Sequence, residues 1–426
     1  MKMKYELDSI PPFIENLLLG LQWFAVAVPI IIIIGKITGS FYLNEPGGQT
    51  VYLQKLCFVM AVTLLCQVLW GHRLPLVAGP STVLLIGIIA SRGFNADTVY
   101  SAILSGGVLL VLLSITGLFA HLRRLFTPRV VAAVLLLIAF TLTPTIMRLI
   151  ADPGNGASPF CNISFALVFT FFMFLLHRHL KGVWKSTLII WALLAGCFLY
   201  FVFVPGTTGL IPSVRGGSVF SMFDHLIITL SFDPGVLISF LFCFLALFIN
   251  DLGSIESMVE MLRPAEVSSR ITRGIAVTGL ANLLSGLLGV IGPVNYSLSP
   301  GVIASTGCAS RFTLIPTAAM LLVLAFFPAA IGLVENVPSV VIGSVLIYIL
   351  CSQISAGLLI VFESAAEFRF ENGLVIGLPI LTGTVTAFLP EGVLGTFPSM
   401  LRPILGNGFV VGVISAMILE HWILKD

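Results

Sequence analysis

Polar side chains interrupt an apolar part of the chain between Pro293 and Gly307, which reads Pro-Val-Asn-Tyr-Ser-Leu-Ser-Pro-Gly-Val-Ile-Ala-Ser-Thr-Gly. Its amide and hydroxyl groups could hydrogen-bond a polar ligand. The residues before Pro300 favour an extended backbone, and Pro300 suits the first turn of a helix, where its missing N–H costs nothing. The stretch therefore predicts a short strand and a half-helix, the arrangement of many substrate sites in secondary transporters. The alternative is a re-entrant loop or a kinked packing helix.

Two acidic residues in another apolar segment, Asp251 and Glu256, are the next candidates for chemistry. Ionisable side chains are costly inside a membrane and are commonly functional there. We interpret Asp251 as the site where H⁺ or Na⁺ couples to transport, the alternative being a hydrogen bond within the helix bundle. For Glu256 the two interpretations weigh equally. Asp251 lies 100° around the helix from Asn250, so both side chains can hardly point at one ligand atom.

The composition identifies the class of protein that holds these residues. Of 426 residues, 58% are hydrophobic and 9% are charged, whereas a soluble domain carries about 25% charged residues. The chain is therefore predicted to be an all-α polytopic membrane protein. A net charge of +2 without a basic patch gives no sign of nucleic-acid binding, and the seven Cys lack metal-ligand spacing. Motifs for a nucleophile or a metal are also missing, so we expect no enzyme, no cofactor and no metal.

Fourteen membrane segments are predicted from apolar runs of spanning length. Twelve are continuous, near 16–37, 52–70, 99–121, 130–150, 160–177, 186–205, 234–256, 272–292, 313–334, 338–361, 373–390 and 404–424. Two are shorter and broken, near 75–91 and 294–307. With both termini in the cytoplasm, only six of the 21 Lys and Arg fall in outer segments: Lys36, Lys55, Arg92, Arg148, Arg215 and Arg402. This bias supports cytoplasmic termini.

The chain also repeats itself weakly. Pro128-Arg-Val-Val-Ala-Ala-Val-Leu resembles Pro338-Ser-Val-Val-Ile-Gly-Ser-Val-Leu, and Leu76-Val-Ala-Gly-Pro-Ser-Thr-Val resembles Leu298-Ser-Pro-Gly-Val-Ile. Seven segments per half is an odd number, so the halves must have opposite orientations in the membrane. The sequence thus predicts a 7+7 inverted repeat in which segments 3 and 10 are each a strand plus a half-helix, with a site where they meet. Chance similarity between apolar runs is the alternative.

Several motifs in order resemble the nucleobase–ascorbate transporters, also called the nucleobase:cation symporter-2 or uracil/xanthine permease family. They are Gly20-Leu-Gln22, Gly79-Pro-Ser81, Pro128-x-Val-Val, Arg273-Gly-x4-Gly279-Leu-x-Asn-Leu-Leu-Ser-Gly, Gly301-Val-Ile-x-x-Thr306-Gly-x-Ala-Ser-Arg311 and Leu405-Gly-Asn-Gly-Phe-Val-Val-Gly412. The resemblance covers nearly the whole chain. It implies a carrier of nucleobases, coupled to H⁺ or Na⁺, that works by an elevator-type mechanism as a homodimer in the cytoplasmic membrane.

The resemblance also implies a division into core and gate domains. The core comprises residues 1–122 and 231–312, continuing to about 335, and the gate comprises 123–230 and 336–426. The substrate-site positions it implies are Ser81, Thr82, Asn250, Ser254, Ser297, Leu298, Ser299 and Gly301.

Departures from the family's pattern concern the substrate. The family's acidic residue in segment eight is replaced by Asn250, and the Glu or Gln that opens the signature of segment ten is replaced by Leu298. Without these acids we expect weak binding of uracil and better binding of an oxidised purine that can ionise. The alternative is an anion transporter of the related sulfate-permease type, carrying bicarbonate, sulfate or carboxylate, because half-helix N-termini with few nearby acids suit an anion.

Overall fold

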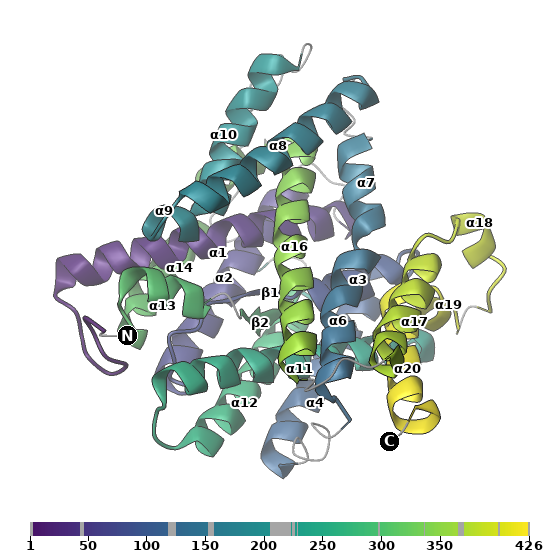
Figure 1. Cartoon of the computed structure of the whole chain (residues 1–426). Helices are drawn as coiled ribbons and strands as arrows, with labels where there is room; N and C mark the ends of the chain where they lie inside the picture. Colours follow the sequence, from purple (N-terminus) through teal and green to yellow (C-terminus); the bar gives the residue numbers. More distant parts are fainter. Residues whose placement is uncertain are drawn as a thin grey trace.

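A computed structural model describes residues 3–42, 47–117, 125–151, 157–204, 223, 226–227, 229–296, 299–335, 337–364, 370–398 and 401–424. The first half holds α1 (Phe13–Tyr42), α2 (Gly48–Leu69), β1 (Ala78–Pro80), α3 (Thr82–Ala90), α4 (Ala96–Thr116), α6 (Pro128–Thr141), α7 (Thr143–Ala151), α8 (Pro159–His179), α9 (Val183–Ser186) and α10 (Leu188–Phe203). The second half holds α11 (Pro234–Leu262), α12 (Val267–Leu288), β2 (Pro293–Asn295), α13 (Ser299–Thr306), a 3₁₀ turn at Arg311–Thr313, α14 (Leu314–Ala325), α15 (Pro328–Glu335), α16 (Ser339–Ser364), α17 (Phe370–Ala387), α18 (Glu391–Leu394), α19 (Arg402–Leu405) and α20 (Gly408–Ile418), which a π-helical turn extends (Figure 1).

The helices are those of a polytopic membrane protein. Within the described residues, eight are long and apolar enough to cross a membrane, and three shorter apolar helices accompany them. Pro29 and Pro379 lie inside α1 and α17, as expected of membrane helices, where neighbouring groups compensate the lost hydrogen bond.

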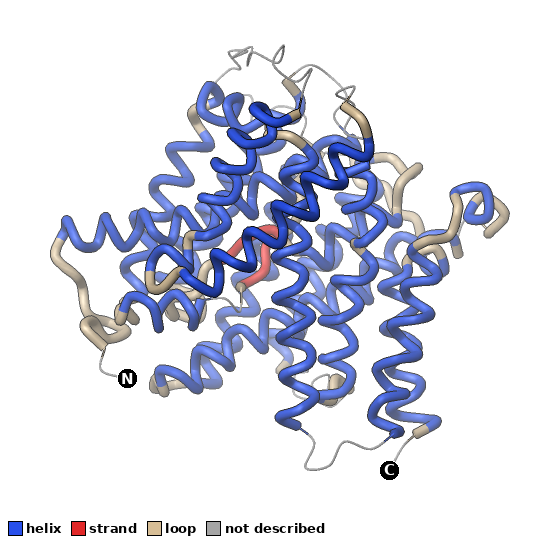
Figure 2. The backbone as a smooth tube through the Cα atoms, turned by 45° about the horizontal axis from the view of Figure 1, so that its top comes forward, coloured by secondary structure: helices blue, strands red, loops and turns tan. Residues whose placement is uncertain are grey.

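The two broken segments meet at the centre of the molecule, which confirms the predicted strand and half-helix in each. β1 and β2 pair antiparallel, with Ala78 opposite Asn295 and Pro80 opposite Pro293 (Figure 2). The half-helices α3 and α13 follow directly. Pairing the strands with each other satisfies backbone groups that would otherwise lack partners deep in the protein.

Helices from the two halves interlock around this pair. α4 packs along α12, and α2 packs along α14. Glycines allow the α4–α12 backbones to approach closely: a Cβ added at Gly107 would lie 2.7 Å from Leu283 N, and one at Gly286 would lie 2.8 Å from Leu104 N. Small residues serve the same purpose in other membrane helix pairs.

The repeated motif found in the sequence begins two helices that pack together. α6 starts at Pro128 and α16 at Ser339, directly after Pro338, and the two helices lie in contact. The predicted continuous segment near 313–334 is split into α14 and α15, however. In the segment near 130–150, Leu142 is a single turn residue between α6 and α7, and Pro128–Ala151 remains one of the eight spanning helices. Pro328 begins α15, because a first-turn proline loses no helical hydrogen bond.

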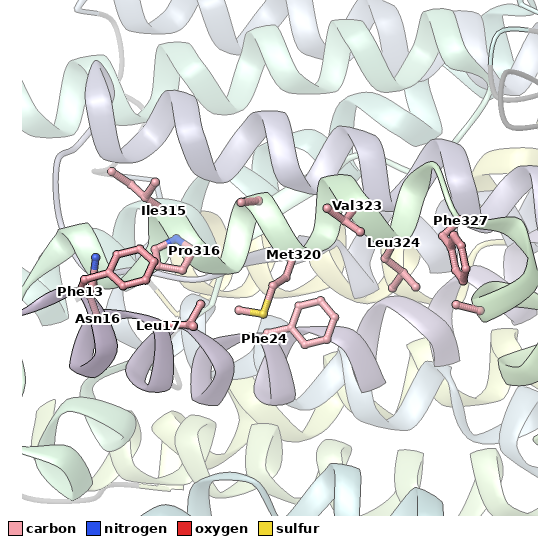
Figure 3. Close-up of a pocket in the computed structure, with 12 residues that line it drawn as sticks. Phe13, Asn16, Leu17, Phe24, Ile315, Pro316, Met320, Val323, Leu324 and Phe327 are labelled. Atoms are coloured by element: carbon pink, nitrogen blue, oxygen red, sulfur yellow. The ribbon is translucent and has the colours of Figure 1, made fainter.

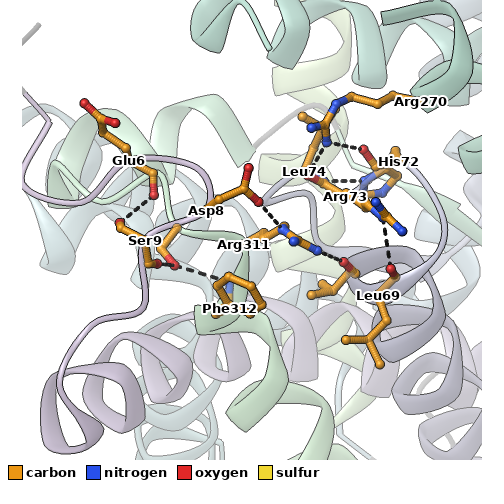
Figure 4. A network of polar contacts seen from close by, with 12 residues as sticks. Glu6, Asp8, Ser9, Leu69, His72, Arg73, Leu74, Arg270, Arg311 and Phe312 are labelled. Carbon is orange, nitrogen blue, oxygen red and sulfur yellow. Dashed lines mark hydrogen bonds and ion pairs between the residues drawn. The ribbon is translucent and has the colours of Figure 1, made fainter. Parts of the chain in front are cut away.

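The N-terminal segment, residues 3–11, lies against the stretch that follows α13. Tyr5 and Cys308 form a parallel bridge, with Lys4 N donating to Gly307 O at 2.7 Å and Ala309 N donating to Tyr5 O at 2.9 Å. Arg311 then joins this segment to α2, because its Nε lies 2.7 Å from Asp8 Oδ1 and its Nη1 donates to the Val68 carbonyl (Figure 4).

Candidate functional site

A cavity of about 350 Å³ lies beside the paired strands, between α3 and α11 on one side and α6 and α16 on the other. Its polar lining consists of Thr82, Asn250, Ser254, Ser257, Tyr296, Ser352 and Gln353, and its apolar lining includes Ile30, Val131, Val134, Leu135, Ile249, Ile349 and Ile360. The volume and the few polar groups on apolar walls are typical of a small-molecule site.

The start of α3 points into this cavity. Ser81 is its N-cap: the Ser81 hydroxyl accepts a hydrogen bond from Leu84 N at 3.3 Å, and Ser81 N donates to Gly292 O at 2.9 Å. Ser81 is fully buried, whereas the next residue, Thr82, lines the cavity. Ser81 therefore joins the half-helix to Gly292, directly before β2, and Thr82 and the positive end of the helix face the cavity.

Tyr296 forms another wall of the cavity. Its hydroxyl donates to Pro80 O at 2.8 Å and its backbone N donates to Val77 O at 2.9 Å. The ring lies against Gly79, where an added Cβ would come within 2.4 Å of it. Glycine at position 79 thus leaves the space that the tyrosine ring occupies.

Replacing Gly79 by Ala should displace Tyr296 and weaken its bond to Pro80. Overpacking of this kind costs about 1–3 kcal/mol, so the purified variant should melt several degrees lower and bind its ligand more weakly. Gly377→Ala is the matched control, because a Cβ there meets nothing within 4 Å. Thermal unfolding in detergent measures both, and equal melting of the two variants would show that Tyr296 adapts without loss.

Two predicted site serines mainly hold the backbone of the second broken segment. Ser254 Oγ lies 2.9 Å from both Asn250 O and Asn295 O, and it also lines the cavity. Ser299 Oγ accepts from Val77 N at 3.1 Å and donates to Tyr296 O at 3.1 Å, fully buried. Of the other predicted positions, Gly301 lies in α13, while Ser297 and Leu298 lie outside the described residues.

Asn250 and Asp251 face different surroundings, as their angular separation predicts. Asn250 lines the cavity from α11. Asp251 is 1% exposed, and its carboxylate accepts three hydrogen bonds: Oδ1 from Asn295 N at 2.9 Å and Asn295 Nδ2 at 2.7 Å, and Oδ2 from Thr278 Oγ1 at 2.8 Å. Glu256, farther along α11, is half-buried and is not among the cavity-lining residues.

The bonds of Asp251 belong to a closed ring of five buried residues, Asp251, Thr278, Gln67, His72 and Asn295, which joins α11, α12, the end of α2, the turn after it and β2. Gln67 Nε2 donates to Thr278 Oγ1 at 3.0 Å, and Gln67 Oε1 accepts from the backbone N of His72 at 3.3 Å. His72 Nε2 lies 3.3 Å from Asn295 Oδ1, which closes the ring.

The protonation of His72 follows from its surroundings. His72 lies in the turn between α2 and β1, where burial lowers its pKa to about 3, so the ring is neutral at physiological pH. Its Nδ1 accepts a hydrogen bond from Leu74 N at 2.9 Å. The single ring proton is therefore on Nε2, which donates to Asn295. Every bond in the ring then has one donor and one acceptor, with Asp251 as a carboxylate.

Another hollow, of about 650 Å³, runs between α1 and α14 (Figure 3). Phe13, Leu17, Phe24, Met320 and Phe327 line it, and Asn16 is the polar residue among those that do. Such a wall suits lipid chains rather than a polar solute. Within the described residues, no three His, Cys, Asp or Glu side chains gather as ligands for a metal. The cavity beside the strands, where the two broken segments meet, is the candidate site.

Sequence reasoning did not place Tyr296, Ser257, Ser352 or Gln353 at this site. Tyr296 lies within the polar stretch 293–307, four residues before Pro300, and that position was a usable signal. Ser352 and Gln353 lie on α16, a long apolar helix, and only its packing beside α6 shows which face meets the cavity.

Comparisons with known proteins agree with the fold and with the resemblance seen in the sequence. Residues 14–392 match the xanthine/uracil permease model, described as a permease family. The chain is 27% identical to the xanthine permease of Bacillus subtilis, over 96% of this chain and 93% of that protein. It is 22% identical to the uric acid transporter UacT of Escherichia coli, over 97% and 87%. These relatives are transporters, not enzymes.

Solved structures share the fold. The transmembrane domain of the cyanobacterial bicarbonate transporter BicA superposes with a TM-score of 0.63 at 15% identity, covering 87% of this chain and 95% of that one. The murine anion transporter Slc26a9 gives a TM-score of 0.62 at 12% identity, covering 96% and 69%. The match of the family model over most of the sequence decides the assignment. The chain belongs to the xanthine/uracil permease family.

Proposed function

We propose that this protein carries a purine or a related nucleobase across the cytoplasmic membrane. The observation that supports this most directly is the cavity where the half-helix α3 begins, with Thr82, Asn250, Ser254 and Tyr296 in its wall. Amides and hydroxyls both donate and accept hydrogen bonds, as the edge of a planar heterocycle requires. The names of relatives, xanthine permease and uric acid transporter, favour the same class of substrate.

The charge of the site narrows the substrate. Among the described lining residues there is no carboxylate to accept ring N–H protons. The positive end of α3 favours an electron-rich or ionised ligand instead. An oxidised purine that ionises therefore fits better than uracil. Ser81, Ser297, Leu298, Ser299 and Gly301 complete the proposed substrate site, with Ser81 and Ser299 holding its backbone in place.

The proposed architecture is two inverted halves of seven membrane segments each. An inverted repeat would make α12 the counterpart of α2, and α14 the counterpart of α4. The repeat would then relate the α4–α12 contact to the α2–α14 contact. Both contacts are present, which supports the scheme. In this scheme residues 1–122 and 231–312, with α14 and α15, form the core. Residues 123–230 and 336–426 form the gate. The candidate cavity lies between elements of the two.

Transport would proceed by an elevator movement, in which the core carries the ligand past the gate. The cavity is lined by the first half of α6 and the later parts of α11 and α16, so it opens on the side that the topology assigns to the cytoplasm. Asp251 is the proposed coupling residue for H⁺ or Na⁺, with Glu256 as a second. Pairing of gate domains would make a homodimer, with both termini cytoplasmic.

An anion carrier is the competing function, because both solved neighbours described above are titled anion or bicarbonate transporters. At 15% identity and below, that likeness concerns the fold alone. The relatives that match over most of the sequence are permeases of xanthine and uric acid, and they favour the nucleobase.

Uptake of labelled solutes by cells that lack their own permeases tests the proposal. The panel contains purines, pyrimidines, urate, bicarbonate and dicarboxylates. We expect saturable uptake of xanthine or urate, weak uptake of uracil and none of bicarbonate. Uptake of bicarbonate or a dicarboxylate without any purine would overturn the proposed function and favour the anion carrier.

A further inference from the structure

A second polar cavity, of about 290 Å³, lies at the far end of α3 from the candidate site. The helix begins at Thr82 in the wall of the candidate site, and Ile86, Ile89 and Ala90 near its end line the second cavity. Nine residues of helix separate the two ends, which is about 13 Å. The remaining walls come from α6, α7, the end of α17 and the segment that leads into α20.

Three arginines from separate segments line this second cavity. Arg92 follows α3, Arg148 lies on α7, and Arg402 begins α19. Arg92 also lies over the ring of Phe41 at 3.9 Å. The described lining includes Thr141, Thr145 and Thr386 but no Asp or Glu. Three guanidinium groups, which keep their charge at physiological pH, thus lie around one cavity.

The floor of this arginine cavity is closed by contact between core and gate elements. Asn407 lies in its wall and caps α20, and Asn407 Nδ2 donates to Ser239 Oγ of α11 at 3.0 Å, both residues being buried. α20 runs from this cavity to the C-terminus. With cytoplasmic termini, the arginine cavity therefore faces outside, on the route to the candidate site.

We propose that Arg92, Arg148 and Arg402 form an outer vestibule that collects a planar substrate in its anionic form before the core moves. This inference rests on the proposed function. Guanidinium groups are planar, keep their charge, and bind delocalised oxyanions with paired N–H donors or by stacking on a flat ring. An ionised oxidised purine offers both features. A neutral purine offers the flat ring without the charge, so the vestibule favours the anion.

Uptake kinetics of two purines test the vestibule. Urate is the anionic substrate and hypoxanthine the neutral one, each measured at low and physiological ionic strength. Replacing all three arginines by Gln should raise KM for urate about tenfold at low salt, within the range of electrostatic attraction by a charged cleft, and change KM for hypoxanthine less than twofold. Salt should reduce the effect. Arg402→Lys should keep most urate uptake, and Arg178→Gln, on α8, controls for lost charge elsewhere.

A second measurement needs no substrate. Thr145→Cys places a thiol in the vestibule, and its labelling from outside by an anionic sulfonate methanethiosulfonate is compared with labelling by a cationic trimethylammonium reagent. The ratio of the anionic to the cationic labelling rate should be several-fold higher with the three arginines present than in the variant that has Gln at all three positions. The vestibule proposal would be overturned if the labelling ratio were the same with and without the three arginines. It would also be overturned if the triple Gln variant lost urate and hypoxanthine uptake equally. Absence of all purine uptake with a changed labelling ratio would instead reject the proposed function alone.

Discussion

Asp251→Asn should abolish accumulation of substrate against a gradient while ligand binding and exchange persist. The proposed coupling cation balances the Asp251 carboxylate, and an amide cannot supply that charge. The fold should tolerate the change: the Asn oxygen can accept from Asn295, and Thr278 can reorient its hydroxyl to accept from the new amide. Concentrative uptake and counterflow exchange in cells or vesicles, at equal expression, measure the two activities separately.

Two further variants separate coupling from structure. Asp251→Leu removes the acceptor of three buried hydrogen bonds, at about 1–3 kcal/mol for each stranded donor. That sum approaches the whole stability of many proteins, so this variant should not be recovered folded. Glu260→Gln removes an exposed acid from the same helix and should behave as wild type. If the Asn variant accumulates substrate as wild type does, Asp251 holds the structure together and does not couple transport.

Asn250→Glu should strengthen binding of neutral bases. Asn250 lines the candidate cavity, and a carboxylate there would accept ring N–H protons. A hydrogen bond to a charged group contributes about 1.5–3 kcal/mol, which corresponds to roughly a 10- to 150-fold gain in affinity. The same negative charge should weaken binding of urate. Titration calorimetry on purified protein with uracil, xanthine and urate measures all three.

Asn250→Gln is the control, because it lengthens the side chain without adding charge. It should change affinities for neutral and anionic ligands alike. Tight uracil binding by the unaltered protein, with no gain in the Glu variant, would place the substrate away from Asn250. The family's second acidic position corresponds to Leu298, outside the described residues, so the single variant is the sharper test.

The central features of the fold could be predicted because proline and polar residues in an apolar chain have few structural solutions. Pro300 after a polar run can begin a helix but cannot continue one, and the strand and half-helix at 293–306 follow from that. The break after Ala325 was not predicted. It lies in an apolar run, where hydropathy shows length but does not show where packing divides a helix.

The candidate site, like the fold, was predicted in part. Thr82, Asn250 and Ser254, positions that the family resemblance implies, all line the cavity: Thr82 begins the half-helix α3, and α11, which carries the other two, packs against β2. A hydrogen bond of Asp251 within the helix bundle was the alternative interpretation, and the bonds to Thr278 and Asn295 show it, but the ring they belong to could not be foreseen. Gln67 contributes to it from the end of α2 and His72 from the turn that follows, both far from Asp251 in sequence, and neither belongs to a motif. Pairing of this kind depends on the packing of α2 against α12, which no local pattern encodes.

The central strand pair also constrains the order in which parts of the protein fold during synthesis. β1 is complete when residue 80 has been synthesised, but its partner, residues 293–295, follows after most of the remaining chain. Until then the backbone groups of β1 have no strand to pair with, and lipid cannot supply hydrogen bonds. The membrane segment that contains β1, near 75–91, must therefore stay in water or within the insertion machinery until β2 has been made. The N-terminal segment waits longer still, since Tyr5 docks beside Cys308. Residues 3–11, although made early, are thus among the last of the described residues to find their native contacts, and the candidate site forms late in synthesis.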